Sequence, residues 1–168
     1  MTTFQPKKSN QSDCFMTPKS AWQAISHLIP KDKQIWEPFY GSGESGKFLE
    51  ELGFEVVHNN NDFFENDEGE IIVTNPPFSK SKEVINRLKK LGKPFILLMP
   101  CAKVITSYFR ENFKDTENHL QIIIPRKRIH FMKHTDGKPV EGWKLQTAFD
   151  CFYYAWKMNL PRDILWLE

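Results

Sequence analysis

Short runs of apolar residues alternate along this sequence with longer stretches in which apolar residues recur every three or four positions. The first pattern is typical of buried strands and the second of amphipathic helices. The first helix is expected from about residue 18 to residue 28, with Thr17 as its N-cap and Pro18 as its first residue. Its buried face would consist of Ala21, Trp22, Ile25 and Leu28.

Strands and helices then follow each other in turn. The stretch "KQIWEPFYGSGESGKFLEELGFEVVHNNNDFF" predicts a strand, a glycine-bearing turn, a helix that ends at Gly53, a second short strand and a loop. "EGEIIVTNPPF" adds a third strand, and "SKEVINRLKKLGKPFILLMP" adds a helix and another strand. "YFRENF" predicts a short helix, and residues 119–158 predict late strands around a loop with a turn at Asp136-Gly137.

This alternation indicates an α/β fold, in which helices cover both faces of a mostly parallel sheet. The last two strands are expected to form an antiparallel hairpin at the edge of the sheet. One domain is predicted over residues 13–168, after a flexible arm at residues 1–12. Ligands of such sheets bind at the carboxyl ends of the strands. Glu37, Asp62 and Asn75 directly follow apolar strands, so they should line one crevice.

Composition sets broad limits. The chain has 168 residues, 40% of them hydrophobic, and a net charge of +2, which permits a nucleic-acid partner without requiring one. It shows neither the apolar core of a signal peptide nor the ~20 apolar residues of a membrane span, so a soluble intracellular protein is expected. Cys14, Cys101 and Cys151 lack zinc-ligand spacing and are expected to be reduced thiols. His130 and His134 lack the partners of a metal site, so no metal is expected.

The stretch "WEPFYGSGESG" places Gly41 and Gly43 between a strand and a helix, where glycine allows a sharp turn close to a ligand. A tight turn without a ligand would use the same residues. A P-loop is excluded because Lys47 is not followed by Ser or Thr. Gly41, Gly43 and Gly46 fit the spacing of a dinucleotide site, but the carboxylate of Glu37 would repel a pyrophosphate. A cofactor with an ammonium and a sulfonium group, such as S-adenosylmethionine (SAM), suits that carboxylate better.

The stretch "TNPPFS" forms a stiff corner after the third strand. Pro76 and Pro77 fix two φ angles and remove two backbone donors. Pro76 also biases Asn75 towards an extended conformation. The corner therefore presents hydrogen-bond acceptors beside the ring of Phe78. A plain turn with Phe78 in the core is the alternative interpretation.

Four motifs occur in the order "DCFMTP", "EPFYGSG", "NDFF" and "NPPF". They resemble motifs of the SAM-dependent N6-adenine DNA methyltransferases, namely the element before the SAM motif, the D/E-P-F-x-G-x-G motif, the adenine-contacting Asp-x-Phe and the D/N/S-P-P-Y/F/W catalytic motif. The match covers about Asp13 to Pro100, and the tail "RIHF…DG…FDCFYYAW" is similar to the end of the small phage-type enzymes. The resemblance implies a Rossmann-like class I methyltransferase fold with a seven-stranded sheet.

The resemblance also implies SAM as the cofactor. Thr17 should reach the methionine carboxylate of SAM, and Glu37 should meet its amino group directly or through water. Gly41 and Gly43 should let the loop pass under the methionine. The implied cofactor-binding set is Thr17, Glu37, Pro38, Phe39, Gly41, Gly43, Asn59, Asn60, Asp62, Phe63 and Phe64.

The residues expected to bind the adenine and the ribose of the cofactor follow the family pattern less completely. By the resemblance, Asp62 should accept a hydrogen bond from the cofactor's adenine amine, and Phe63 or Phe64 should pack on the ring. Family members carry an acid for the ribose hydroxyls at the end of the second strand. Asn59 or Asn60 occupies roughly that place here. An amide also hydrogen-bonds a hydroxyl but lacks the charge of the acid.

The corner suits methylation of an adenine amine, whose lone pair is delocalised into the ring. The side-chain oxygen of Asn75 and the carbonyl of Pro76 would each accept one N–H of the amine. This draws the nitrogen towards tetrahedral geometry and frees its lone pair in the transition state. Phe78 would stack on the base. The implied catalytic set is Asn75, Pro76, Pro77 and Phe78.

A base within a duplex has to be flipped out of the stack, which requires contacts to phosphates. "PRKRIHFMK", including Phe131, and "SKSK" are the candidate stretches, although an ordinary solvated surface has the same composition. About 90 residues follow the corner, so target recognition is expected to be weak, confined to the loop "HTDGKPVEGW", or supplied by a protein partner or a homodimer. The candidate nucleic-acid-binding residues are Lys80, Lys82, Arg126, Lys127, Arg128 and Lys133.

DNA is the expected substrate, in the cytoplasm or, for a phage or viral enzyme, in the host cytoplasm. RNA is the nearest alternative, because the corner does not distinguish the two sugars. A methyltransferase for glutamine side chains of proteins is a second alternative, and Phe78 in place of Tyr argues mildly against it. A catalytically silent nucleic-acid-binding subunit is a third.

Overall fold

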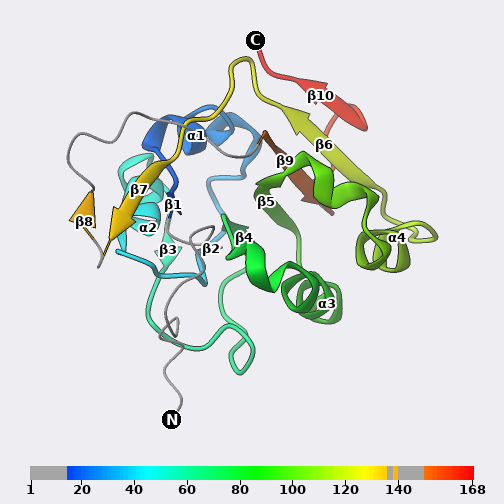
Figure 1. Cartoon of the computed structure of the whole chain (residues 1–168), viewed down its shortest axis with the longest axis horizontal. Helices are drawn as coiled ribbons and strands as arrows, with labels where there is room; N and C mark the ends of the chain where they lie inside the picture. Colours follow the sequence, from blue (N-terminus) through cyan, green and yellow to red (C-terminus); the bar gives the residue numbers. More distant parts are fainter. Residues whose placement is uncertain (1–14, 136–137, 140–149) are drawn as a thin grey trace.

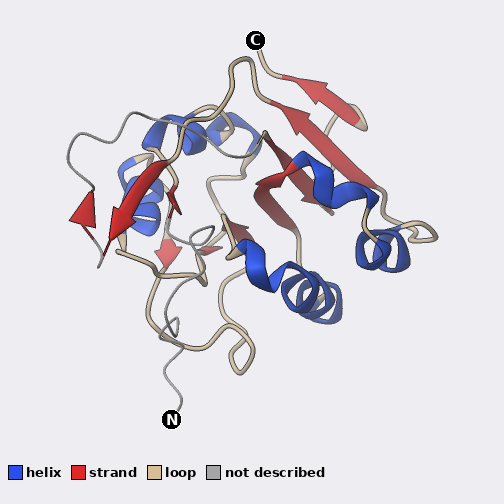
Figure 2. Cartoon of the chain, viewed as in Figure 1, coloured by secondary structure: helices blue, strands red, loops and turns tan. Residues whose placement is uncertain are grey.

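The computed structural model describes residues 15–135, 138–139 and 150–168 (Figure 1). The expected arm at residues 1–12, the Asp136-Gly137 turn and most of the "HTDGKPVEGW" loop lie outside these residues. The described chain forms one large sheet with helices around it and a small second sheet at one side (Figure 2).

The large sheet has seven strands in the order β10-β6-β9-β5-β4-β2-β3. Strand β9 runs antiparallel to both of its neighbours, and all the other pairings are parallel. The prediction of an α/β fold with a mostly parallel sheet is confirmed. The strands are β2 (Ile35–Trp36), β3 (Val56–Val57), β4 (Ile71–Thr74), β5 (Phe95–Pro100), β6 (Leu120–Ile124), β9 (Cys151–Trp156) and β10 (Ile164–Trp166).

The late antiparallel pair is present as β6 and β9, with Leu120 opposite Trp156. It does not form the edge of the sheet, because β9 also pairs with β5 and because β10 pairs with the outer side of β6. The sequence pattern did not predict β10, since three residues between polar loops are too short for a periodic signal.

A small sheet lies beside the large one, in the order β1-β7-β8. β1 (Phe15–Met16) pairs antiparallel with β7 (Met132–Thr135), which pairs with β8 (Lys138–Pro139). Figure 1 shows β7 returning past α1 and α2 to meet β1. This pairing joins the start of the described chain to the segment that follows β6.

The helices lie on both faces of the large sheet. Tyr153 and Tyr154 are neighbours on β9 and point to opposite faces. The Tyr153 hydroxyl donates to the Ala21 carbonyl at 2.6 Å, and the Tyr154 ring packs on Phe109 at 4.8 Å, so α1 and α4 cover different faces. The helices are α1 (Lys19–Gln23), η2 (Ser26–Leu28), α2 (Glu44–Glu51), η3 (Phe78–Lys80), α3 (Ser81–Leu91), η4 (Cys101–Ile105) and α4 (Ser107–Phe113).

The helix predicted over residues 18–28 is divided into α1 and η2. The hydroxyl of Ser26 donates to the Gln23 carbonyl at 3.0 Å, where the helix ends. The prediction of Thr17 as N-cap is wrong, because Pro18 occupies that position and no side chain caps the helix. The Thr17 hydroxyl instead contacts Asn75 at the carboxyl end of β4.

Gly46 lies within α2 in a place without room for a side chain. A Cβ there would lie 2.3 Å from Cγ of His58, which directly follows β3. The absence of a side chain therefore lets α2 pack closely against the end of β3.

We predict that Gly46→Ala lowers the free energy of unfolding by about 1–3 kcal/mol, because the new methyl group overpacks this contact. Urea unfolding measures the change. The double variant Gly46→Ala/His58→Gly removes the clashing ring and should unfold at a higher urea concentration than the His58→Gly single variant. An increase of about 1 kcal/mol in the Gly46→Ala single variant, as at an open helical site, would contradict the close packing.

Candidate functional site

Three of the buried polar side chains in the described chain lie at the carboxyl ends of β1, β2 and β4. Glu37 follows β2 and is 1% exposed, Thr74 ends β4 and is 0% exposed, and Thr17 follows β1 and is 6% exposed. Buried polar groups are stable only with hydrogen-bond partners. The contacts of these side chains therefore define the site.

The carboxyl group of Glu37 accepts three hydrogen bonds. The Thr74 hydroxyl and the Phe39 N–H both donate to Oε1, the latter at 3.2 Å. The Ser45 hydroxyl donates to Oε2 at 2.8 Å and accepts from the indole N–H of Trp22 at 2.9 Å. One buried acid thus links β2, β4, α2 and α1.

Burial raises the pKa of Glu37 from its usual 4.5 to about 8, because the charged form loses its hydration. The hydrogen bonds from Thr74, Ser45 and Phe39 lower this pKa, but by less than burial raises it. Burial therefore extends the protonated form of this acid to a higher pH than for an exposed glutamate. A cation bound beside Glu37 would favour the carboxylate and displace the proton.

The glycine turn has the sharp conformation that the sequence predicts. Gly41 and Gly43 have φ angles of 56° and 82°, in the left-handed region that favours glycine. The Gly43 N–H donates to the Tyr40 carbonyl at 2.7 Å, and Gly43 is the N-cap of α2. A Cβ on Gly43 would lie 2.8 Å from the Tyr40 hydroxyl oxygen, and one on Gly41 would lie 3.4 Å from Met16. The turn is therefore packed beneath Met16 and Tyr40.

Asn75 carries a buried acceptor at the end of β4. Its amide nitrogen donates to the Thr17 hydroxyl at 3.0 Å. Its Oδ1 is buried and receives no hydrogen bond within the described chain. A buried carbonyl without a donor costs about 1–3 kcal/mol. The contact with Thr17 therefore holds the amide in an orientation that leaves one acceptor for a ligand.

A small pocket of about 40 Å³ joins these groups. It has room for one or a few water-sized groups, and not for a nucleoside. Thr17, Glu37 and Asn75, which the sequence places far apart, all line it. The full lining is Met16, Thr17, Glu37, Phe39, Tyr40, Gly41, Glu44, Ser45 and Asn75.

The corner that follows Asn75 is held firmly. Pro76 and Phe78 are buried and Pro77 is partly exposed. The Phe78 carbonyl accepts hydrogen bonds from the Ser81 hydroxyl at 2.7 Å and the Lys103 ammonium at 3.5 Å. With 8% exposure, the Phe78 ring lies against the core, and stacking on a base would require it to be uncovered.

Asp62, Phe63 and Phe64 form a turn outside the lining of the pocket. Oδ1 of Asp62 accepts the Phe64 N–H at 2.7 Å. Phe63 is buried, and its ring centroid lies 5.0 Å from that of Phe39. Phe64 is only partly buried, so it is the ring of the two that retains an accessible face.

The two asparagines at the end of β3 differ in their surroundings. Asn59 donates to Glu68 at 2.9 Å and accepts the N–H of Asn61 at 3.0 Å, while Asn60 is exposed. Asn61 also donates to Glu68, at 2.9 Å. An acid is therefore present at this end of β3, and it comes from the loop before β4.

Most of the candidate phosphate-binding cations lie on the surface. Lys80, Lys82, Arg126 and Lys127 are exposed, as is Arg128, which pairs with Asp150 at 3.0 Å. Lys133 lies in β7. The expectation that Phe131 contacts nucleic acid is wrong for this structure, because the side chain is 1% exposed and packs in the core.

Several residues of the site were not predicted from the sequence. Thr74 could have been found, because it is the polar residue of the buried strand "IIVT". Ser45 and Lys103 carry no signal in the sequence, since only the folded chain brings them to Glu37 and to the Phe78 carbonyl. Glu68 is separated from Asn59 by a loop and likewise has none.

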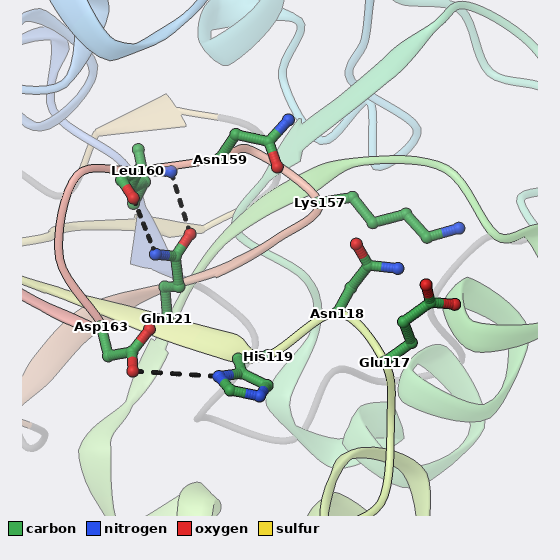
Figure 3. Close-up of a pocket in the computed structure, with 8 residues that line it drawn as sticks. All are labelled: Glu117, Asn118, His119, Gln121, Lys157, Asn159, Leu160 and Asp163. Carbon is green, nitrogen blue, oxygen red and sulfur yellow. Dashed lines mark hydrogen bonds and ion pairs between the residues drawn. The ribbon is translucent and has the colours of Figure 1, made fainter.

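A larger hollow of about 380 Å³ lies at the other end of the strands, where the parallel strands of the sheet begin (Figure 3). Figure 3 shows Gln121 bonded to both backbone groups of Leu160, and His119 beside Asp163. These contacts fix the loop between β9 and β10. The smaller pocket is the better candidate for a functional site, because it contains the buried acid and the unpaired acceptor.

Other kinds of site find no support among the described residues. No group of three or more His, Cys, Asp or Glu side chains there could hold a metal ion. Cys101 and Cys151 are free thiols, and burial raises the pKa of Cys151 to about 12. No helix in the described ranges is both long and apolar enough to span a membrane.

Comparison of the sequence with protein-family models gives no match, and the curated proteins give none either. Solved structures do match. A Listeria monocytogenes protein assigned to the class I SAM-dependent methyltransferases has a TM-score of 0.50 and 15% identity, over 95% of this chain and 67% of its own. A Pyrococcus horikoshii protein assigned as an RNA methyltransferase has a TM-score of 0.51 and 15% identity, over 91% of each chain. The chain thus has the fold of the class I SAM-dependent methyltransferases.

The pKa of Glu37 predicts how stability depends on pH. The folded state binds the Glu37 proton more tightly than the unfolded state does, so its contribution is fully present below pH 4.5 and is lost as the pH rises to about 8. The expected loss is a few kcal/mol. Glu37→Gln keeps the shape of the protonated acid and should not show this loss. Urea unfolding of both proteins between pH 5 and pH 9 measures the difference. Parallel curves would show that Glu37 is charged in the folded protein.

Proposed function

We propose that this chain is a SAM-dependent methyltransferase that transfers a methyl group to the exocyclic N6 amine of adenine in DNA. The observation that carries the proposal is the buried, unpaired Oδ1 of Asn75 beside the buried acid Glu37. The fold supports methyl transfer, and the motif resemblance supports the choice of adenine and DNA.

The pocket residues fit the methionine part of SAM. Glu37 is the acid that would meet the amino group, and Thr17 has a hydroxyl beside it in the same pocket. Gly41 and Gly43 give the turn its sharp conformation, and Met16 and Tyr40 pack against them. Because the pocket is only about 40 Å³, Tyr40 would have to move to admit the whole methionine group.

The nucleoside part of SAM would lie outside the pocket. Asp62 and Phe64 are the residues proposed for its adenine. Glu68, held by Asn59 and Asn61, supplies the carboxylate that the asparagines themselves lack for the ribose hydroxyls. When bound, SAM supplies an electrophilic methyl group on a sulfonium.

Asn75 would act on the substrate amine. Its Oδ1 accepts one N–H, and the Pro76 carbonyl accepts the other. The two acceptors stabilise the positive charge that develops on the nitrogen. They are preorganised, because Thr17 holds the amide and the two prolines stiffen the backbone. Phe78 would pack on the base once uncovered.

Exposed cations near the corner would position the nucleic acid. Lys80 and Lys82 lie directly after the corner, and Arg126 and Lys127 follow the carboxyl end of β6. Parallel strands end at the same edge of a sheet, so these cations and Asn75 share that edge. Such contacts neutralise phosphates without reading the sequence.

We predict that Asn75→Ala lowers the rate of methyl transfer by about 10²–10³-fold, as expected for the loss of one preorganised hydrogen-bonding partner of the transition state. SAM affinity, measured by calorimetry, should change little. Asn118→Ala is the matched control, because Asn118 lies at the other end of the strands, and it should retain full activity. Normal turnover by Asn75→Ala would contradict the proposed role of the corner.

The substrate is tested with labelled SAM and a panel of duplex DNA, single-stranded DNA, RNA and protein extract. We expect N6-methyladenine in DNA after digestion and mass analysis. Label in RNA or on glutamine would contradict the proposed DNA substrate, but it would agree with the chemistry proposed for the corner. SAM binding without any transfer would indicate a silent subunit.

A further inference from the structure

Strand β10 forms an open apolar edge of the large sheet. Nothing in the described chain pairs with its outer side. Ile164 is 53% exposed and Trp166 is 69% exposed, and the two side chains share one face of the strand. Leu165 and Leu167, on the other face, pack against the core. An exposed strand edge with large apolar side chains is a template for pairing with another strand.

The backbone of β10 has a defined orientation. The Ile122 N–H donates to the Asp163 carbonyl, and the Leu167 N–H donates to the Ile124 carbonyl. Residues with odd numbers therefore direct their backbone groups towards β6. By alternation, the N–H and C=O groups of Ile164 and Trp166 point outward.

The strand is also held in place. Gln121 donates to the carbonyls of Leu160 and Arg162, each at 3.0 Å, and accepts the N–H of Leu160 at 3.0 Å. Figure 3 shows the two bonds between Gln121 and Leu160. The loop that leads into β10 is thus fixed to β6. The outer edge is therefore presented in a preorganised form, which lowers the entropy lost on pairing.

The edge is complementary to a second copy of itself. In an antiparallel pair centred on Leu165, Ile164 of one copy lies opposite Trp166 of the other, and their outward backbone groups form closely spaced hydrogen-bonded pairs. In the same register Arg162 lies opposite Glu168, so opposite charges meet at both ends. Both of these side chains are exposed, and neither forms an ion pair within the described chain.

We propose that the chain forms a two-fold symmetric homodimer through antiparallel pairing of β10 with β10 of a second copy, in the register centred on Leu165. Shifting the register by two residues in either direction would keep the hydrogen-bond alternation but would separate Arg162 from Glu168. The charges therefore select one register. Ile164 and Trp166 of both copies form one apolar strip on the face of the sheet that α4 covers.

This arrangement has a consequence for the candidate site. The two copies run antiparallel, so their carboxyl edges point in opposite directions. The pocket around Glu37 and Asn75 lies at that edge, several strands away from β10. The dimer joins two sites that do not share a surface, and each site should bind its ligand independently.

Sedimentation velocity over a concentration series tests the proposal. The wild-type chain should move from its monomer mass of 19.8 kDa towards twice that mass as the concentration rises. Ile164→Lys should raise the dissociation constant by about tenfold or more, because two charges enter the apolar strip. Ile105→Lys is the matched control, because Ile105 is 85% exposed and lies in η4. It should leave dimerisation unchanged.

A charge exchange tests the register. Arg162→Glu and Glu168→Arg should each weaken the dimer, and the double variant should restore it. Circular dichroism checks that each variant is folded. A chain that remains monomeric at every concentration would overturn the proposal, as would a dimer that tolerates both Ile164→Lys and Arg162→Glu. A dimer that is weakened by Ile164→Lys but not restored by the charge exchange would overturn the register.

Discussion

The rest of the site depends on how Glu37 is buried and hydrogen-bonded. This side chain is buried at the junction of two central strands, and its hydrogen bonds reach β4 through Thr74 and α1 through Ser45 and Trp22. The hydrogen bonds from Thr74, Ser45 and Phe39 offset part of the cost of burying this acid. The same network places the carboxyl group in the pocket that Asn75 lines. The contacts that stabilise the fold therefore also organise the chemistry.

Asn75 completes this arrangement in a different way. Both carboxyl oxygens of Glu37 accept hydrogen bonds, whereas Oδ1 of Asn75 is buried and has no donor within the described chain. A cation bound beside Glu37 would favour its carboxylate form. An amine would donate to the unused Oδ1 of Asn75. Both changes are what the proposed methyl transfer requires. The low identity to the solved methyltransferases means that the fold alone does not identify the substrate.

Much of the fold and part of the site could be predicted from the sequence, because both depend on local patterns. The alternating apolar runs predicted the sheet, and Glu37 and Asn75 were recognised because they follow strands. Interactions between distant segments left no such pattern. The position of β9, the contact of Thr17 with Asn75, and the approach of Glu68 to Asn59 arise only when the chain folds. The roles proposed for Asp62 and Phe64 in cofactor binding remain predictions.

We propose that Glu37 meets the cationic methionine group of SAM, and SAM affinity as a function of pH tests this contact most directly. Titration calorimetry of the wild type and Glu37→Gln between pH 6 and pH 8.5 gives the ratio of their affinities, which cancels the titration of SAM itself. Because burial raises the pKa of Glu37 to about 8, the cation must displace a proton at lower pH. We expect the affinity advantage of the wild type over Glu37→Gln to grow as the pH rises towards 8. A ratio that stays constant across this range would contradict it.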